Sequence, residues 1–211
     1  FGGGSDFPEF FQDHHGAVLA TAIDKYIYHF ITYFHSHLFN YSIRLAYSKV
    51  ECVSRLGDIQ HAPFREILRA MNVKRDVEIS LAADLPSFSG LGSSSSFTVG
   101  LLNALHAFKG DFVPKDKLAA LAIHLERDVL GEAVGFQDQI TAAYGGLNII
   151  EFQGAGNFTV SRVTPSKTKL QELDDSLLLF FTGITRRAEN LERSKLKNLP
   201  ALRANLKRMV H

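Results

Sequence analysis

The sequence predicts an α+β fold, and two observations carry this prediction. Its 211 residues are 45% hydrophobic and 21% charged, which is the balance expected of a globular chain with a substantial core. The predicted strands and helices come in blocks, in the order strands, helices, strands, helices. A parallel sheet built from βαβ units would instead require a regular alternation. Disorder, collagen and coiled coil are excluded as the main state of the chain.

Strands are predicted in the N-terminal part because β-branched and aromatic residues dominate there. The expected strands cover Ala17–Ile23, Lys25–Phe34 and Ile43–Val53. A short helix is expected over Ala62–Met71. A further strand is expected over Val77–Ala83, and it ends at the turn that Pro86 closes.

Helices are predicted in the middle of the chain because apolar residues recur there at helical spacing. One helix is expected over Ser93–Lys109, where Gly110 ends it. Pro114 is well placed as the first residue of a second helix, which ends at Gly131. A third, short helix covers about Phe136–Tyr144. The segments Leu147–Phe152 and Phe158–Val163 then form a hairpin.

The C-terminal part begins at a polar, charged segment over Ser166–Asp175, which predicts a domain boundary. A continuous apolar run over Leu177–Thr182 predicts a central, buried strand. Two amphipathic helices, Arg186–Asn198 and Ala201–His211, are expected to follow it. Pro200 separates them, because proline interrupts the hydrogen bonding of a helix interior.

Charge and cysteine content exclude several classes of protein. Lys and Arg total 23 and Asp and Glu total 22, so no broad basic field predicts a nucleic-acid partner. No run approaches the roughly 20 apolar residues of a membrane span, so no membrane partner is expected. Cys52 is the single cysteine and lies in an apolar run, where we expect a small core residue. A chain that cannot form an internal disulfide favours a reducing, cytoplasmic location.

The strongest functional signal is the segment PSFSGLGSSSS over residues 86–96, which follows a predicted strand and opens a helix. Gly90 and Gly92 let the backbone bend sharply and approach a ligand closely. The first helical turn, at Ser93–Ser95, presents N–H groups without intrahelical partners, and with the helix dipole these favour an anion.

Three other interpretations of this loop are weaker. A Walker A loop would need a lysine after the second glycine, and the dinucleotide fingerprint would need a third glycine. A flexible linker would not lead directly into an amphipathic helix. We therefore interpret the loop as a phosphate-binding loop, whose serine hydroxyls can also hold a Mg²⁺ ion that bridges phosphates.

Glu126 and Asp138 form a second constellation, because they lie near the facing ends of two consecutive predicted helices. Phosphoryl transfer uses one carboxylate to hold Mg²⁺ and another to orient the attacking hydroxyl. From spacing alone, Glu126 is better explained as a solvated helix residue. Asp138 is equally well explained as an acid stabilised by the helix dipole.

The loop and two other segments together resemble the GHMP kinases, the family of galactokinase and of homoserine, mevalonate and phosphomevalonate kinases. The pattern Pro-x-x-x-Gly-Leu-Gly-Ser-Ser-Ser, from Pro86, resembles the nucleotide-binding loop of that family. The opening FGGGSDFP, residues 1–8, resembles its first motif in the sugar-kinase form. Residues 16–26 and 181–186 further resemble the branch that phosphorylates D-glycero-D-manno-heptose 7-phosphate.

The resemblance implies an N-terminal, ATP-binding domain over residues 1–165 with the fold of ribosomal protein S5 domain 2. It implies the start of a ferredoxin-like C-terminal domain over residues 166–211. The third glycine-rich motif of the family does not occur in these 211 residues, so we expect the second domain to be incomplete.

The resemblance also implies ATP and Mg²⁺ as cofactors and gives the site residues their roles. Asp138 would be catalytic, and Ser94 and Glu126 would hold the metal. ATP would contact Pro86, Ser89, Gly90, Leu91, Gly92, Ser93, Ser94 and Ser95. The sugar or sugar phosphate would contact Ser5, Asp6, Gly145 and Arg186. For Asp6 the alternative is the capping of a turn, and for Arg186 a solvated position at a helix start.

The function implied is transfer of the γ-phosphate of ATP to the anomeric hydroxyl of D-glycero-D-manno-heptose 7-phosphate. A GHMP kinase for another acceptor, such as fucose or another sugar, stays open. So does a non-catalytic relative that binds a nucleotide or metabolite, and so does a homodimer. Other family members pair the catalytic Asp with a basic residue near the amino terminus, which would precede Phe1 here.

Overall fold

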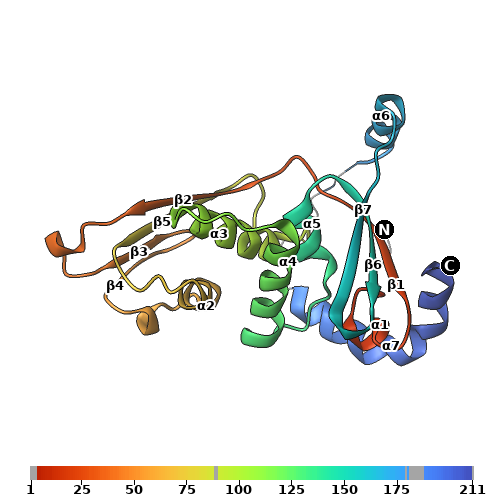
Figure 1. Cartoon of the computed structure of the whole chain (residues 1–211), viewed down its shortest axis with the longest axis horizontal. Coiled ribbons are helices and arrows are strands. Elements are labelled where there is room, and N and C mark those ends of the chain that lie inside the picture. The colour runs from red at the N-terminus through yellow and green to blue at the C-terminus, as the bar shows by residue number, and fades with distance from the viewer. Residues whose placement is uncertain (1–3, 88–89, 179, 181–187, 211) are drawn as a thin grey trace.

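The computed structural model describes residues 4–87, 90–178, 180 and 188–210 of the chain. These residues form two β-sheets, one toward each end of an elongated molecule, with helices between and beside them (Figure 1). The helices and strands follow one another in blocks, so the mixed fold of separate sheets and helices is confirmed. The arrangement matters for function because the candidate site lies on the helices between the sheets.

The larger sheet has the strand order β2-β5-β3-β4. Its strands are β2 (Ile27–Tyr33), β5 (Val77–Ala83), β3 (Ile43–Ala46) and β4 (Val50–Val53). β3 runs parallel to β5, and the other pairs are antiparallel. Helices α2 (Ala62–Ala70) and α3 (Ser93–Phe108) contribute to the core on one face of this sheet, where Leu45, Ile79 and Leu101 are fully buried.

The smaller sheet has the order β1-β6-β7, with all neighbours antiparallel. Its strands are β1 (Gly16–Thr21), β6 (Leu147–Gln153) and β7 (Asn157–Arg162). Helices α1 (Pro8–Phe11), α5 (Gln137–Tyr144) and α7 (Ala188–Val210) share a second core with it. The rings of Phe11 and Phe152 stack at the centre of that core, with 5.4 Å between their centroids.

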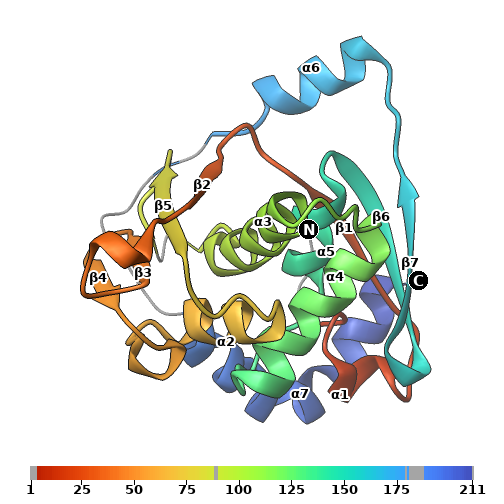
Figure 2. The same ribbon diagram turned by 60° about the vertical axis from the view of Figure 1, so that its left-hand side comes forward.

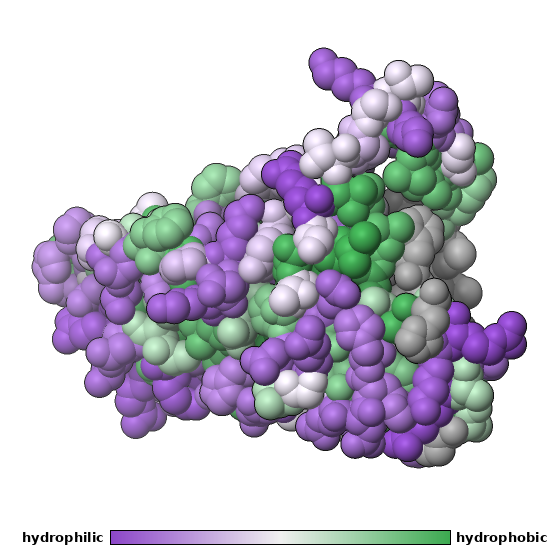
Figure 3. Space-filling model, turned by 45° about the vertical axis from the view of Figure 1, so that its right-hand side comes forward, coloured by the Kyte–Doolittle hydropathy of each residue, from purple (hydrophilic) through white to green (hydrophobic). Residues whose placement is uncertain are grey.

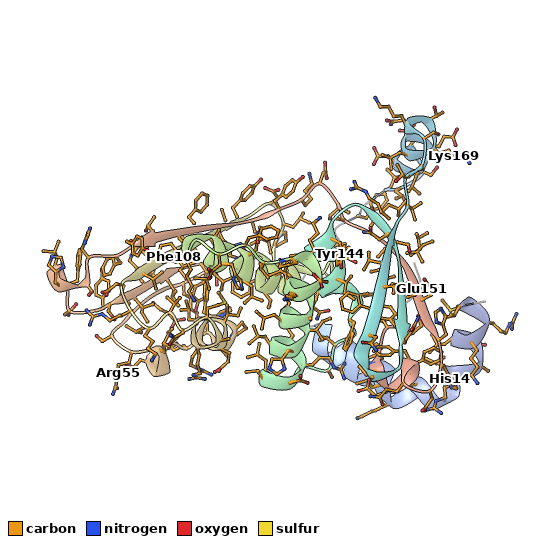
Figure 4. The ribbon with its side chains drawn as sticks, in the orientation of Figure 1. His14, Arg55, Phe108, Tyr144, Glu151 and Lys169 are labelled. Carbon is orange, nitrogen blue, oxygen red and sulfur yellow. The ribbon has the colours of Figure 1, made fainter. Side chains whose placement is uncertain are left out.

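Helix α4 (Lys115–His124) lies between the two cores and belongs to both. Leu118 and Ala122 pack in the first core, whereas Ala119 and Ile123 pack in the second. The short π-helical segment Leu125–Val129 continues it directly. Helices α3, α4 and α5 lie side by side in both ribbon views (Figure 2), and Tyr144 at the end of α5 marks the junction with the smaller sheet (Figure 4).

The prediction of one strand over Ile43–Val53 is wrong, because the chain turns back on itself within it. β3 and β4 form a hairpin, in which the amide of Tyr47 donates to the carbonyl of Lys49. Cys52 is also not a core residue, since its side chain is exposed. Glu51 is instead the buried residue of β4, where its carboxylate accepts hydrogen bonds from the hydroxyl of Tyr47 and the amide of Gln60, both at 2.7 Å.

The predicted boundary segment folds as helix α6 (Lys167–Asp175), which projects from the molecule (Figure 1). The strand expected over Leu177–Thr182 is not present in its described part, since Leu177, Leu178 and Phe180 are exposed and belong to no strand. Thr182 lies outside the described residues. A hydrophobic area is visible beneath the projecting α6 (Figure 3).

The two helices expected around Pro200 are one continuous helix, α7, so that prediction is wrong. Leu199 and Leu206 lie on one side of α7 and are buried against the second core. Burying this stripe offsets the single hydrogen bond that a proline removes from a helix interior. Although α7 has 23 residues, no helix of the described ranges is both long and apolar enough to cross a membrane.

The side chain of His29 on β2 faces α3, and the ring and the helix backbone are unusually close to each other. A Cβ atom on Gly100 would lie only 2.6 Å from Cε1 of His29, so the contact depends on the absence of a side chain at position 100. Burial lowers the pKa of His29 to about 4, and no partner in the described residues bonds its Nε2. The ring is therefore neutral at pH 7 in the folded protein.

We expect His29 to make the protein acid-labile between pH 6.5 and pH 4. The unfolded chain binds a proton on this ring near pH 6.5 and the folded protein only near pH 4, so stability falls as the pH drops through this window. The loss amounts to about 3 kcal/mol. Urea unfolding at pH 7 and pH 4 should show a smaller loss for His29→Gln than for the wild type. An equal loss in both proteins would contradict this.

Candidate functional site

The glycine-rich loop delivers the chain from β5 to the first turn of α3. Gly92 precedes the helix in the left-handed conformation, with φ of +70°, and Gly90 has φ of +79°. Both values suit glycine and strain other residues. The first backbone bond of the helix runs from the amide of Ser96 to the carbonyl of Gly92, and no side chain of the described residues caps the helix. The amides of Ser93–Ser95 therefore precede the first intrahelical bond and are available to an anion.

Asp138 lies directly beside this loop. It is in the first turn of α5, its side chain is exposed, and its Oδ2 is 3.4 Å from the position that a Cβ atom on Gly92 would occupy. The structure thus brings a carboxylate against the N-terminus of α3. A group bound by the amides of Ser93–Ser95 would therefore lie close to the carboxylate of Asp138.

Glu126 is buried at the back of the same site, with 1% of its surface exposed. Its Oε2 accepts hydrogen bonds from Ser95 Oγ at 2.9 Å and from Gln139 Nε2 at 2.5 Å. Its Oε1 has no partner in the part of the chain that the structure describes. Burial raises the pKa of Glu126, although the nearby donors of Thr98, Gln139 and Ser95 act in the opposite direction.

The helices that carry these groups match a known family model. Residues 61–146 match the model described as "GHMP kinases N terminal domain". The match runs from α2 to α5 and includes the loop, Glu126 and Asp138. Over these residues the chain is similar to a GHMP kinase N-terminal domain. The resemblance inferred from the sequence motifs is confirmed at this level.

Proteins similar to this chain include sugar kinases. The D-glycero-alpha-D-manno-heptose 7-phosphate kinase of Campylobacter jejuni is 30% identical over 203 residues, which are 92% of this chain and 60% of that protein. The galactokinase of Thermotoga maritima is 28% identical over 135 residues, which are 62% of this chain and 38% of that enzyme. The chain therefore spans about three fifths or less of the length of these two relatives.

A solved structure shows the same fold. The crystal structure of a D-glycero-D-manno-heptose 1-phosphate kinase from Bacteroides thetaiotaomicron superposes with a TM-score of 0.77 and 24% identity. The match covers 98% of this chain and 70% of that one. At this identity the likeness establishes the fold alone.

The metal ligands that the resemblance implies are Ser94 and Glu126. Ser94 is exposed on the first turn of α3, and it is Ser95, its buried neighbour, that bonds Glu126. A divalent cation still fits this site, because Oε1 of Glu126 is a buried oxygen without a donor and Mg²⁺ prefers oxygen ligands. Among the described residues no cluster of three or more His, Cys, Asp or Glu could hold a metal, so phosphate oxygens would have to complete its coordination.

Ser5 and Asp6, expected to contact the sugar, are both buried and bonded within the protein. Ser5 Oγ donates to the carbonyl of Ala17 at 2.8 Å. Asp6 is 2% exposed, and its two oxygens accept hydrogen bonds from the amides of Gly4 at 3.0 Å and Gln137 at 3.3 Å. These contacts show Asp6 in the capping role, at the start of α5. Contact with a sugar stays a prediction.

The remaining predicted site residues lie in three different situations. Pro86, Gly90 and Leu91 are exposed in the loop. Gly145 ends α5 with φ of +66°, and a Cβ atom there would meet no atom of the described residues within 4 Å. Ser89 and Arg186 lie outside the described residues.

Gln139 is the site residue that sequence reasoning missed. Its side chain is fully buried and bonds Glu126, whereas the sequence pattern predicts no function for this position of the helix. Phe136, Gln139, Ile140 and Ala143 fall at helical spacing on one stripe, which packs inward. A polar residue on an otherwise apolar stripe was the signal that could have found it.

The Asp6 cap makes position 135 intolerant of any side chain. A Cβ atom on Gly135 would lie 1.8 Å from Oδ2 of Asp6, so Gly135→Ala must displace the buried carboxylate. We expect this variant to lose about 3 kcal/mol of unfolding free energy, from overpacking and the broken cap. Gly57→Ala is the matched control, because a Cβ atom at Gly57 meets nothing within 4 Å. Urea denaturation of both measures the difference, and equal stabilities would contradict the prediction.

Proposed function

We propose that this chain carries the nucleotide-binding domain of an ATP-dependent sugar kinase, which transfers the γ-phosphate to a sugar hydroxyl. One observation carries the proposal: the carboxylate of Asp138 lies beside Gly92, at the N-terminus of α3. Free helix amides bind phosphate, and a carboxylate near the terminal phosphate can orient an attacking hydroxyl. A plain nucleotide-binding module would have no use for an exposed carboxylate this close to the phosphates.

Each group of site residues has a different role in phosphoryl transfer. The amides of Ser93–Ser95 hold the phosphate chain and compensate its charge. Asp138 accepts a hydrogen bond from the acceptor hydroxyl, directs its oxygen toward the γ-phosphate and takes up its proton. Because the transition state is largely dissociative, positioning contributes more than basicity. Ser94 and Glu126 would hold Mg²⁺, which when bound neutralises charge on the phosphates.

The acceptor that we propose is the anomeric hydroxyl of D-glycero-D-manno-heptose 7-phosphate. The relative from Campylobacter jejuni, which is named for phosphorylation of this class of compound, supports it across 92% of the chain. The similarity to the galactokinase of Thermotoga maritima covers less of the chain, 62%, and supports a sugar acceptor without specifying the sugar. A second GHMP acceptor, such as fucose or galactose, is therefore the alternative.

We further propose the division into domains that the resemblance implies. Residues 1–165 would form the N-terminal domain, with the S5 domain 2 fold, and residues 166–211 would begin the ferredoxin-like C-terminal domain. The family match within residues 61–146 supports the first part. ATP as the phosphate donor favours a cytoplasmic location.

Activity measurements on the full-length protein test the function directly. ATP and Mg²⁺ are supplied with heptose 7-phosphate, fucose, galactose or mannose, and the formation of ADP is followed together with the ³¹P NMR signal of the product. We expect ADP formation above background with heptose 7-phosphate, and a product signal typical of an anomeric phosphate. Turnover with another sugar only would exclude the proposed acceptor, and absence of both turnover and ATP binding would exclude the kinase.

A further inference from the structure

The side chain of Gln139 lies at the centre of the site, yet the proposed chemistry gives it no task. It follows Asp138 on α5 and is fully buried. Its amide nitrogen donates to Oε2 of Glu126 at 2.5 Å. A buried amide on the apolar stripe of a helix is costly unless it is bonded, so this contact is the feature that keeps Gln139 in place.

The two carboxylate oxygens of Glu126 have different surroundings. Oε2 receives both hydrogen bonds, from Ser95 and from Gln139, whereas Oε1 receives none from the described residues. Oε1 of Gln139 is likewise buried without a partner there. An unpaired buried acceptor costs free energy, so an arrangement with two of them is suited to a ligand that the polypeptide does not supply. Hard oxygen atoms favour a divalent cation with its water molecules.

The same hydrogen bonds join the two halves of the site. Ser95 belongs to the turn of α3 that presents the free amides, and Gln139 belongs to the turn of α5 that carries Asp138. Glu126, in the π-helical segment after α4, accepts from both. One oxygen atom of Glu126 thus connects three helical segments through hydrogen bonds. A displacement of a catalytic group by roughly 1 Å can lower the reaction rate 10²-fold, so these hydrogen bonds affect catalysis directly.

We propose that Gln139 is a positioning residue of this site. By holding one oxygen of Glu126, it leaves the other free for a divalent cation, and it fixes Asp138 relative to the N-terminus of α3. Gln139 acts through these two residues and does not itself contact the substrate. The inference rests on the proposed kinase function and adds to it a residue outside the predicted set.

Binding of Mn²⁺, a paramagnetic substitute for Mg²⁺, tests this without relying on turnover. The full-length protein and Gln139→Met are titrated with Mn²⁺ in the presence of ADP, and the free ion is quantified by electron paramagnetic resonance. Methionine keeps the length of the side chain and removes its amide donor. We expect the dissociation constant for Mn²⁺ to rise by about 10- to 100-fold, as for other partners that orient metal ligands. Affinity for metal-free ADP should stay within about twofold, because the amides of α3 remain intact.

Gln137→Met is the matched control. It makes the same chemical change on the other side of Asp138, at a half-buried position of the same turn. It should bind Mn²⁺ and ADP as the wild type does. Gln139→Asn keeps the amide but shortens the side chain by one methylene, and it should lose Mn²⁺ affinity as Gln139→Met does. This second variant supplies the measurement if circular dichroism shows that the methionine variant is unfolded.

Kinetics give an independent readout. For the positioning role, kcat of Gln139→Met should fall by about 10-fold or more, with the KM for the sugar nearly unchanged. A folded Gln139→Met that binds Mn²⁺ as tightly as the wild type would overturn the proposal, and so would an equal loss in Gln137→Met. A wild-type protein that binds no ADP would remove the proposed function itself, and this inference with it.

Discussion

Replacing Asp138 by asparagine is expected to reduce kcat for phosphoryl transfer by about 10²- to 10⁴-fold, the usual contribution of a positioned acid or base. Asparagine keeps the shape of the side chain but loses its charge and its capacity to accept a proton. The amides of Ser93–Ser95 are unchanged, so affinity for ATP should stay within about threefold. Steady-state kinetics and calorimetric titration with ATP measure the two quantities separately.

Asp116→Asn is a close control for this variant. Asp116 is also an exposed acid in the first turn of a helix, α4, and the dipole of that helix stabilises it in the same way. Both variants therefore lose a similar small stabilisation, about 0.5 kcal/mol. Only Asp138 lies beside Gly92. Full activity of Asp138→Asn, or an equal loss in Asp116→Asn, would show that Asp138 has no catalytic role.

The elements around the site could be predicted because their signals are local. β5 spans Val77–Ala83 as expected, and α3 begins at Ser93, directly after the two glycines that permit the bend. Alternation, helical spacing and glycine all act over a few residues and do not depend on the rest of the fold. Adjacency of the loop and Asp138 followed from the family resemblance and not from these patterns.

The errors arose where tertiary contacts decide the outcome. The alternation in β4 places Glu51 inside and Cys52 outside, because the carboxylate finds donors in Tyr47 and Gln60. Hydrophobicity alone favoured the opposite arrangement. Pro200 likewise looked like a break, but α7 is continuous across it, and Leu199 and Leu206 are buried in the second core.

Glu126 shows most clearly what spacing could not reveal. A charged residue among other charged residues at a helix end predicts a solvated side chain, yet Glu126 is almost fully buried. The π-helical segment Leu125–Val129 changes the number of residues per turn, so the face that Glu126 presents departs from the α-helical pattern. Such segments are frequent at functional sites, and they leave no simple periodic signal in a sequence.

Glu126→Gln is expected to reduce kcat/KM by about 10²- to 10³-fold, the range observed when one preorganised electrostatic contact is removed. The same variant should make the metal-free protein more stable, by about 1 kcal/mol at pH 8. The reason is that burial raises the pKa of Glu126, so holding the ionised form inside costs free energy that a neutral amide avoids. Removal of the negative charge of Glu126 would then both lower the activity and raise the stability.

The dependence of this gain on pH separates it from a general effect of the substitution. The unfolded chain releases the Glu126 proton near pH 4.5, whereas the folded protein keeps it to a higher pH. The folded state therefore binds more protons in that window, and the stability of the wild type falls as the pH rises through it. Urea unfolding should show equal stabilities of wild type and Glu126→Gln below pH 4.5, and a constant advantage of the variant above the folded pKa. An advantage of the same size at all pH values would mean that the buried charge does not destabilise the protein, and a less stable variant at pH 8 would mean that the carboxylate is satisfied without a cation.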